Sequence, residues 1–237
     1  MRVGLLFPGE MGAAVGRAVR GDVLWASDGR SEATRQRASG FTDVGSVDEL
    51  VRSSEVVLSI CPPAIAEEVA EQVFGYGFGE TFVEANAISP ARMRRIAKLG
   101  PRIVDGSIIA ATGINLYLAG EEAKTVAKLF EGGEVRAIDL GAEPGAASAL
   151  KMAFGGWNKI GIALTAQAHA IAAAYGVERW LDEEGVPEDR LPRVADRAWR
   201  WAPEMDEIAE VCAELELSDA IPLGAAEFYR RLSQERT

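Results

Sequence analysis

Three glycines follow the first apolar segment of the chain at a spacing that suits phosphate binding. Residues 2–7 form a short apolar run, and Gly9, Gly12 and Gly16 come after it and line an Ala/Val-rich segment. This pattern predicts a strand, a tight turn and a helix. Glycines in such a turn let the backbone approach a pyrophosphate held at the helix N-terminus. The candidate binding turn comprises Pro8, Gly9, Glu10, Met11 and Gly12.

The turn departs from the G-x-G-x-x-G fingerprint at one position, because Phe7 stands where the first glycine is expected. The pattern by itself therefore also fits a structural turn between a strand and a helix. Its context favours a dinucleotide, since residues 23–27 indicate a second strand and a polar turn follows about 20 residues after the glycines, where ribose recognition belongs.

The polar turn offers both an acid and a base. Asp28 would accept from a free 2′-hydroxyl, whereas Arg30 and Ser31 would donate to a 2′-phosphate. We favour Arg30 and the phosphate. The alternative is that Asp28 and Arg30 are solvated turn residues.

A long segment with almost no charge occupies residues 144–175, and its Ala/Leu content predicts one helix of about 48 Å. Its ionisable side chains are Lys151, Lys159 and His169. A buried ammonium must find partners or lower its pKa, which suits a general acid or base; a lysine that snorkels to solvent is the alternative. His169 is 18 positions from Lys151, too far to share a site within one subunit, and we expect it to be a packed or interface residue.

The rest of the chain alternates strands and helices as far as the long helix and is helical and acidic after it. This rhythm predicts a doubly wound α/β domain of the Rossmann type over residues 1–142. The interdomain helix and a smaller all-α domain would occupy residues 143–237. A strand is expected at 102–104, with the segment from Asp105 onward at its end. Because one small domain cannot cover so apolar a helix, we expect a homodimer through the long helix and the C-terminal domain. In this dimer Trp199 and Trp201 would reach the partner's active site.

Composition excludes several classes of partner. A net charge of −11 and a pI near 4.8 argue against nucleic acid and anionic membranes. No window has about 18 consecutive apolar residues, and no signal-like segment precedes the first strand, so we expect neither membrane insertion nor export. Cys61 and Cys212 are too few for a disulfide framework or a zinc site, which favours the cytoplasm. The acidic residues between 204 and 210 fit an exposed helix face at least as well as a metal site.

Five segments, in order along the chain, resemble the β-hydroxyacid dehydrogenase and 6-phosphogluconate dehydrogenase superfamily: FPGEMG, DGRS, SICPP, IVDGSIIAATG and GAASALKMAFGGWNK. The phrases DGSII, LYLAG and GAASALKMA and the tail WRW…EMDEIAE resemble a poorly characterised branch with a phosphogluconate-dehydrogenase-like C-terminal domain. The resemblance covers essentially the whole chain. It implies a Rossmann domain, a catalytic lysine on an interdomain helix, an all-α dimerisation domain and NAD(P)-dependent oxidation of an alcohol or the reverse reduction.

The resemblance also assigns roles by position. Gly9 to Gly12 would face the pyrophosphate, and Arg30 and Ser31 the adenosine ribose. Cys61, Pro62 and Pro63 would form a cofactor-side loop, and Asn86 falls where the family usually places Ser or Thr near the nicotinamide. Lys151 falls on the catalytic lysine, which would be the general acid or base, with Ser107 and Asn158 as further catalytic candidates.

Three departures limit this transfer. The family's substrate segment usually contains D-A-P-V-S-G-G, whereas residues 105–111 are DGSIIAA, so an ordinary 3-hydroxy acid is disfavoured. The asparagine expected four residues after the lysine is Gly155, for which Asn158 is a candidate replacement. Phe7 replaces a glycine and is expected to shift the bound cofactor or weaken its binding.

The leading hypothesis is an oxidoreductase that prefers NADP(H) to NAD(H) and acts on a small alcohol or carbonyl compound. One alternative is an imine reductase-like enzyme, although those enzymes commonly place another acid or a tyrosine where this chain has Lys151. The other is a nucleotide-binding protein without turnover, favoured by the lost glycine and the altered substrate segment.

Overall fold

The structure is a computed structural model that describes residues 1–186 and 194–234. The chain forms two compact units, Met1–Lys151 and Met152–Thr237. The chain passes from one unit to the other at 151/152, within the long helix, whereas the predicted boundary between domains, at 142/143, comes just before this helix. Residues 187–193 and 235–237 of the predicted second domain lie outside the described residues.

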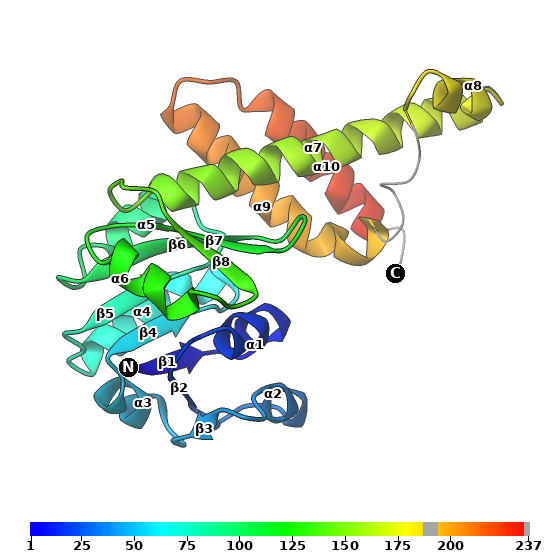
Figure 1. The fold of residues 1–237 in the computed structure, drawn as a ribbon. Coiled ribbons are helices and arrows are strands. Elements are labelled where there is room, and N and C mark those ends of the chain that lie inside the picture. Colours follow the sequence, from blue (N-terminus) through cyan, green and yellow to red (C-terminus); the bar gives the residue numbers. More distant parts are fainter. Residues whose placement is uncertain (187–193, 235–237) are drawn as a thin grey trace. The chain divides into compact units, whose positions relative to one another are not determined.

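Eight strands, counted over the described residues, form one sheet in the first unit (Figure 1). They are β1 (Arg2–Leu6), β2 (Asp22–Trp25), β3 (Thr42–Asp43), β4 (Val56–Ser59), β5 (Thr81–Glu84), β6 (Ile103–Ile109), β7 (Ile114–Ala119) and β8 (Val135–Asp139). Their order is β3-β2-β1-β4-β5-β6-β7-β8, parallel from β3 to β6, antiparallel between β6 and β7, and parallel between β7 and β8. The order 3-2-1-4-5-6 is that of dinucleotide-binding folds, whose ligands bind where the strand order reverses. Here the reversal lies between β1 and β4.

Helices pack against both faces of this sheet. The helices of the first unit are α1 (Glu10–Arg17), α2 (Glu32–Arg37), α3 (Val47–Ser53), α4 (Ala66–Gly75), α5 (Pro90–Ile96) and α6 (Ala123–Ala127), with short 3₁₀ turns at Pro63–Ile65 and Lys128–Phe130. Of these, α2 buries no residue. Val15 of α1 and Val126 of α6 belong to one buried cluster, together with Leu5 of β1. The helices α3, α4 and α5 contribute to a second cluster, which also contains Phe82 of β5. Because consecutive strand residues point to opposite faces, the two clusters lie on opposite faces of the sheet.

The alternation predicted for the first domain is confirmed, and so is the Rossmann-type fold. The prediction of a short strand at 102–104 is wrong, because β6 continues through Ile109 and pairs with β7 as a hairpin. Every residue of β6 is buried. The segment from Asp105 to Ile109 is therefore part of the sheet, and polar residues within it did not mark the end of the strand.

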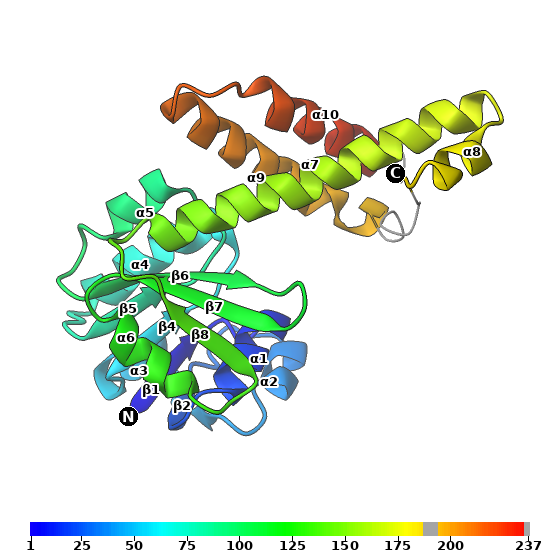
Figure 2. The same ribbon diagram turned by 45° about the horizontal axis from the view of Figure 1, so that its top comes forward.

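The second unit is helical and begins within α7 (Ala146–Ala174), which confirms the predicted long helix. Three helices follow in the described residues: α8 (Glu178–Glu183), α9 (Val194–Glu214) and α10 (Ala220–Gln234). Figures 1 and 2 show α9 and α10 side by side, and the Trp201 ring packs edge-on against Tyr229, with centroids 5.3 Å apart. Trp201 is thus buried within its own unit, contrary to the expectation that it reaches a partner, whereas Trp199 is exposed. Over the described residues, none of the helices has the length and apolar character needed to span a membrane.

Candidate active site

Three of the predicted binding segments leave the sheet at one edge. The register pairs Leu5 with Trp25 and Leu6 with Ser59, so the parallel strands β1, β2 and β4 end side by side. The turn at 7–12, the turn at 28–31 and the loop at 61–63 follow these three strand ends directly. The structure therefore brings together segments that are far apart in sequence, at the reversal of strand order where the fold favours a ligand.

The glycine turn fits a phosphate-bearing ligand. The first N–H groups of α1 receive no side-chain cap, because the N-cap residue is Gly9. A Cβ built on Gly9 would meet no neighbouring atom closer than Phe7 O at 4.0 Å, and the residue has ordinary extended φ and ψ values. Since the folded chain itself tolerates a side chain there, a ligand that must approach the backbone explains the glycine. Gly12 differs, because its Cβ would lie 2.8 Å from Phe7 O, so packing alone requires a glycine there.

Phe7 adopts the backbone conformation that the missing glycine would have supplied. Its φ is +59°, in the left-handed region that bulky residues rarely occupy, and its carbonyl accepts a 2.7 Å hydrogen bond from Gly9 N. The turn is therefore preserved at the backbone level in spite of the substitution. The Phe7 ring also stacks on Arg30, whose Cζ lies 3.9 Å from the ring centroid.

Of the polar turn's three candidates, Arg30 is the best placed for a ligand. Burial of its guanidinium lowers the pKa of Arg30. Asp28 is exposed, and its backbone N–H donates to Gly45 O. The Ser31 hydroxyl caps α2 by accepting from Thr34 N at 3.3 Å, so it already has a structural role.

Two further arginines lie beside this turn, and neither was among the predicted binding residues. Arg35 Nη2 donates to Ser27 O at 2.9 Å, and Arg37 Nε donates to Pro8 O at 3.4 Å. Arg37 thus ties α2 to the glycine turn. The clustering of arginines at 30, 35 and 37 in a chain of net charge −11 was a sequence signal that could have identified them.

The loop at 61–63 is fixed from the inside by Asn86. The Asn86 Oδ1 accepts from Cys61 N at 2.7 Å, and its Nδ2 donates to Cys61 Sγ at 3.2 Å. Asn86 is buried, so its amide holds the loop. Burial, followed by the proximity of Glu84, raises the pKa of Cys61 to about 11, which keeps it a neutral thiol.

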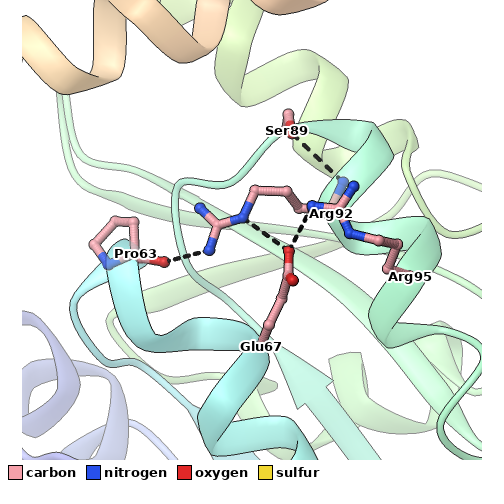
Figure 3. Close-up of polar contacts among 5 residues, drawn as sticks. All are labelled: Pro63, Glu67, Ser89, Arg92 and Arg95. Carbon is pink, nitrogen blue, oxygen red and sulfur yellow. Dashed lines mark hydrogen bonds and ion pairs between the residues drawn. The ribbon is translucent and has the colours of Figure 1, made fainter.

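The same loop is fixed from the other side by α5 (Figure 3). Arg92 Nη2 donates to Pro63 O at 2.8 Å, while its Nε contacts Glu67 Oε1 of α4 at 3.0 Å. Arg95 reaches the same Glu67 oxygen at 2.8 Å. Pro62 and Pro63 themselves are exposed. The loop is therefore held in place while its prolines remain accessible at the sheet edge.

A row of buried polar residues runs from the last residues of β4 and β5 to Asp105, the third residue of β6. The register places Ser59 beside Glu84 and Glu84 beside Asp105. Glu84 is fully buried; its Oε1 accepts from Asn86 N at 3.0 Å, and its Oε2 has no partner among the described residues. Burial raises the pKa of Glu84 to about 8, and the neighbouring Asp105 contributes in the same direction.

Asp105 caps the start of the long helix and thereby positions Lys151. Its Oδ2 accepts from Gly145 N at 2.8 Å and Ser148 N at 3.0 Å, and its Oδ1 accepts from Ser148 Oγ at 2.7 Å. Burial raises the pKa of Asp105, although these donors oppose the rise. Lys151, three residues after Ser148, donates from Nζ to Ile108 O at 2.6 Å. The first turn of α7 is thus joined to β6 by two contacts, one from Ser148 to Asp105 and one from Lys151 to Ile108.

Ser107 lies next to this contact in the sequence of β6. It is fully buried, and its Oγ has no hydrogen-bond partner within the part of the chain that the structure describes. Lys151 is half-buried. The first unit therefore contains an amine and a hydroxyl near the end of β6, in the segment where substrate contacts were predicted.

The remaining candidates on α7 lie in the second unit. Asn158 is half-buried there, and its predicted catalytic role stays a prediction. Lys159 pairs with Glu204 at 2.5 Å, and Asp206 pairs with Arg230. His169 is packed as predicted, with its Nε2 2.7 Å from Val186 O. Ion pairing thus accounts for two of the acidic residues that were considered as a metal site.

Comparisons with known proteins agree with this architecture. Residues 172–232 match the family model of a domain of unknown function, DUF1932. No protein of curated function has a significantly matching sequence. Many solved structures are similar, and the likeness extends over nearly the whole chain.

One similar structure is that of the conserved protein MTH1747 of unknown function, which is described as structurally similar to 3-hydroxyacid dehydrogenases. The two chains are 26% identical with a TM-score of 0.78, and the match covers 100% of this chain and 98% of that one. A Mycobacterium tuberculosis 3-hydroxyisobutyrate dehydrogenase with L-serine is 15% identical, with a TM-score of 0.76 and 99% and 94% coverage. An imine reductase variant from Myxococcus stipitatus in complex with NAD⁺ is 19% identical, with a TM-score of 0.59 and 99% and 94% coverage. The chain therefore has the fold of the 3-hydroxyacid dehydrogenase superfamily, and the resemblance drawn from its sequence is confirmed.

Proposed function

We propose that the protein is an NAD(P)-dependent oxidoreductase that acts on a small alcohol or carbonyl compound. The observation that carries this proposal is the glycine turn. Gly9 has no packing reason to be a glycine, and it begins a helix without a side-chain cap where the strand order reverses. A pyrophosphate explains all three features.

The cofactor contacts follow from this placement. The backbone of Gly9 to Gly12 would hold the pyrophosphate, with Pro8 fixing the turn, and the loop at 61–63 would line the nicotinamide side. We propose a preference for NADP(H), because Arg30 offers a partly exposed guanidinium beside the adenosine end and Arg35 and Arg37 add positive charge there. When bound, the nicotinamide supplies or accepts the hydride.

Lys151 is the proposed general acid and base toward the substrate oxygen. Its Nζ donates to the carbonyl oxygen of Ile108, and a carbonyl accepts from an ammonium and from a neutral amine alike. This contact therefore orients the group in both protonation states. The Asp105 cap fixes the helix turn that bears Lys151, and the buried Ser107 stays a further candidate. Asn158 also stays a candidate.

Cofactor titrations test the proposal directly. Intrinsic fluorescence measured against NADPH and NADH should give a tighter dissociation constant for NADPH, and Arg30→Ala should reduce that preference. Equal binding of both cofactors, or no effect of the substitution, would refute the NADP(H) assignment. Turnover is then sought with NADPH on a panel of small aldehydes, ketones and keto acids.

An imine is the second candidate substrate class. Its support is the apolar character of residues 108–111, where the family's serine and paired glycines are replaced, together with the likeness to an imine reductase. Cyclic imines belong in the same panel. NADPH binding without turnover on any class would favour a nucleotide-binding protein.

We also propose a homodimer in the cytoplasm. Trp157, Leu164 and Ile171 recur every seven residues on α7 and are 66%, 67% and 61% exposed in the described residues. Such a stripe on one helix face is typical of a helix that packs against a partner. Ile221 of α10 is also exposed and, with Leu164, lines a groove of about 520 Å³. Light scattering at micromolar concentration should give twice the chain mass, and a monomer would contradict the dimer.

A further inference from the structure

The side chain at position 7 is the least expected feature of the binding turn. A glycine would adopt φ = +59° without strain, whereas a phenylalanine is held there at a conformational cost. Residues kept in such conformations cluster at functional sites. The backbone alone therefore gives no reason for Phe7, and the reason must lie in its ring.

The ring has one conspicuous partner. The Arg30 guanidinium lies over its face, with Cζ 3.9 Å from the centroid, well within the distance at which cations interact with aromatic rings. Arg30 Nε is buried and has no hydrogen-bond partner in the described residues. Arg30 as a whole remains partly exposed. The stack thus covers part of the guanidinium and leaves the side chain open toward solvent.

The backbone around Arg30 is also fixed. Arg30 N donates to Ser27 O at 3.1 Å, and Gly29 closes this turn with φ = +70°. An arginine side chain normally loses rotamer freedom when it binds a phosphate, and this loss weakens binding. A ring that already holds the guanidinium removes part of the loss.

We propose that Phe7 is a specificity-determining residue whose ring holds the Arg30 guanidinium ready for the 2′-phosphate of the cofactor. This inference rests on the proposed NADP(H) preference. It assigns Phe7 a positioning role, because Phe7 acts through Arg30. A ring that merely filled space would affect NADPH and NADH equally, whereas a ring that positions Arg30 affects the ratio of their affinities.

The test compares variants that separate the ring from the backbone conformation. Phe7→Gly keeps the left-handed turn without strain but removes the ring, and Phe7→Tyr keeps the ring. Phe7→Leu removes the aromatic face and retains an apolar side chain, in case the glycine variant does not fold. Dissociation constants for NADPH and NADH are measured by fluorescence for each variant, for Arg30→Ala and for the double variant Phe7→Gly/Arg30→Ala, after circular dichroism has verified folding.

We expect Phe7→Gly and Phe7→Leu to reduce the NADPH:NADH affinity ratio by about three- to thirtyfold. Phe7→Tyr should retain the ratio, and the double variant should have the same ratio as Arg30→Ala alone. If Arg30→Ala reduces the ratio and loss of the ring does not, the inference about Phe7 is wrong while the NADP(H) preference stands. If Arg30→Ala leaves the ratio unchanged, the proposed preference itself fails, and the role of Phe7 fails with it.

Discussion

The two lysines of α7 have different environments, although they lie on one helix. Lys159, in the second unit, forms an ion pair with Glu204 at 2.5 Å, and the two side chains are only 12% and 16% exposed. Lys151, in the first unit, donates to the carbonyl oxygen of Ile108 at 2.6 Å. A carboxylate stabilises the charged lysine, whereas a carbonyl accepts from either protonation state. The comparison gives Lys159 a role in stability and is consistent with the proposal that Lys151 transfers the proton.

Two acids, Glu204 in the second unit and the buried Glu84 in the first, differ in the same way. Glu204 has a cation within hydrogen-bonding distance, whereas Glu84 is paired in register with a second acid, Asp105. Burial raises the pKa of Glu84 to about 8, and Asp105 adds to this rise. Glu204 of the second unit thus has a cation as its partner, whereas the first unit keeps a carboxyl group that is neutral below this pKa beside its candidate site.

Lys151→Met is the substitution expected to have the largest effect, and it tests the proposed difference between the two lysines. Turnover on any active substrate should fall at least about a hundredfold, because removing a general acid or base typically costs that much or more. The dissociation constant for NADPH should stay nearly unchanged, since the predicted cofactor contacts lie elsewhere. Steady-state kinetics and fluorescence titration measure the two effects, and a variant that turns over near the wild-type rate would assign proton transfer to another group.

Lys159→Met is the matched substitution in the second unit. It should lower the free energy of unfolding by about 3 kcal/mol, because Glu204 would be left as a largely buried charge without its cation. Lys159→Met/Glu204→Leu should recover much of this loss, since the unpaired charge is removed as well. Urea denaturation measures both. A single variant as stable as the wild type would show that the pair contributes no structural stabilisation.

Local sequence patterns were sufficient for the parts of the site that are contiguous in the chain. The turn at 7–12 follows from a strand, glycines and a helix. The uncharged helix drew attention to its two lysines, and the resemblance at GAASALK selected Lys151. The backbone conformation of Phe7 was not predictable from the spacing of the glycines. Residues 7–12 also fit a turn in which Phe7 displaces the backbone from its usual path. The positive φ shows that the turn kept its geometry.

Contacts between distant segments were the part that the sequence did not reveal. Glu84 and Asp105 meet through the register of β5 and β6, and no local pattern specifies that register. Arg92 holds the loop at 61–63 from 29 residues away, and Asn86 holds it from 25 residues away. Asn86 was assigned to the nicotinamide by resemblance, which stays a prediction, and its amide also holds the loop at 61–63. Such residues position a site without belonging to any motif.

Glu84→Gln is expected to have the smallest effect. It sharpens the contrast between Glu204, which is paired with a lysine, and Glu84, which lies beside another acid. The pKa of Glu84 is raised from 4.5 to about 8 in the folded protein, so the folded state binds its proton more tightly than the unfolded state between these values. The contribution of Glu84 to stability is therefore greatest below about pH 4.5 and declines as the pH rises toward 8. Glutamine has the same shape and does not ionise, so Glu84→Gln should be stabilised relative to wild type by about 1–3 kcal/mol at pH 8.5. The difference should shrink as the pH falls toward 5. Urea denaturation at several pH values measures it, and a difference independent of pH would mean that Glu84 does not titrate in this range.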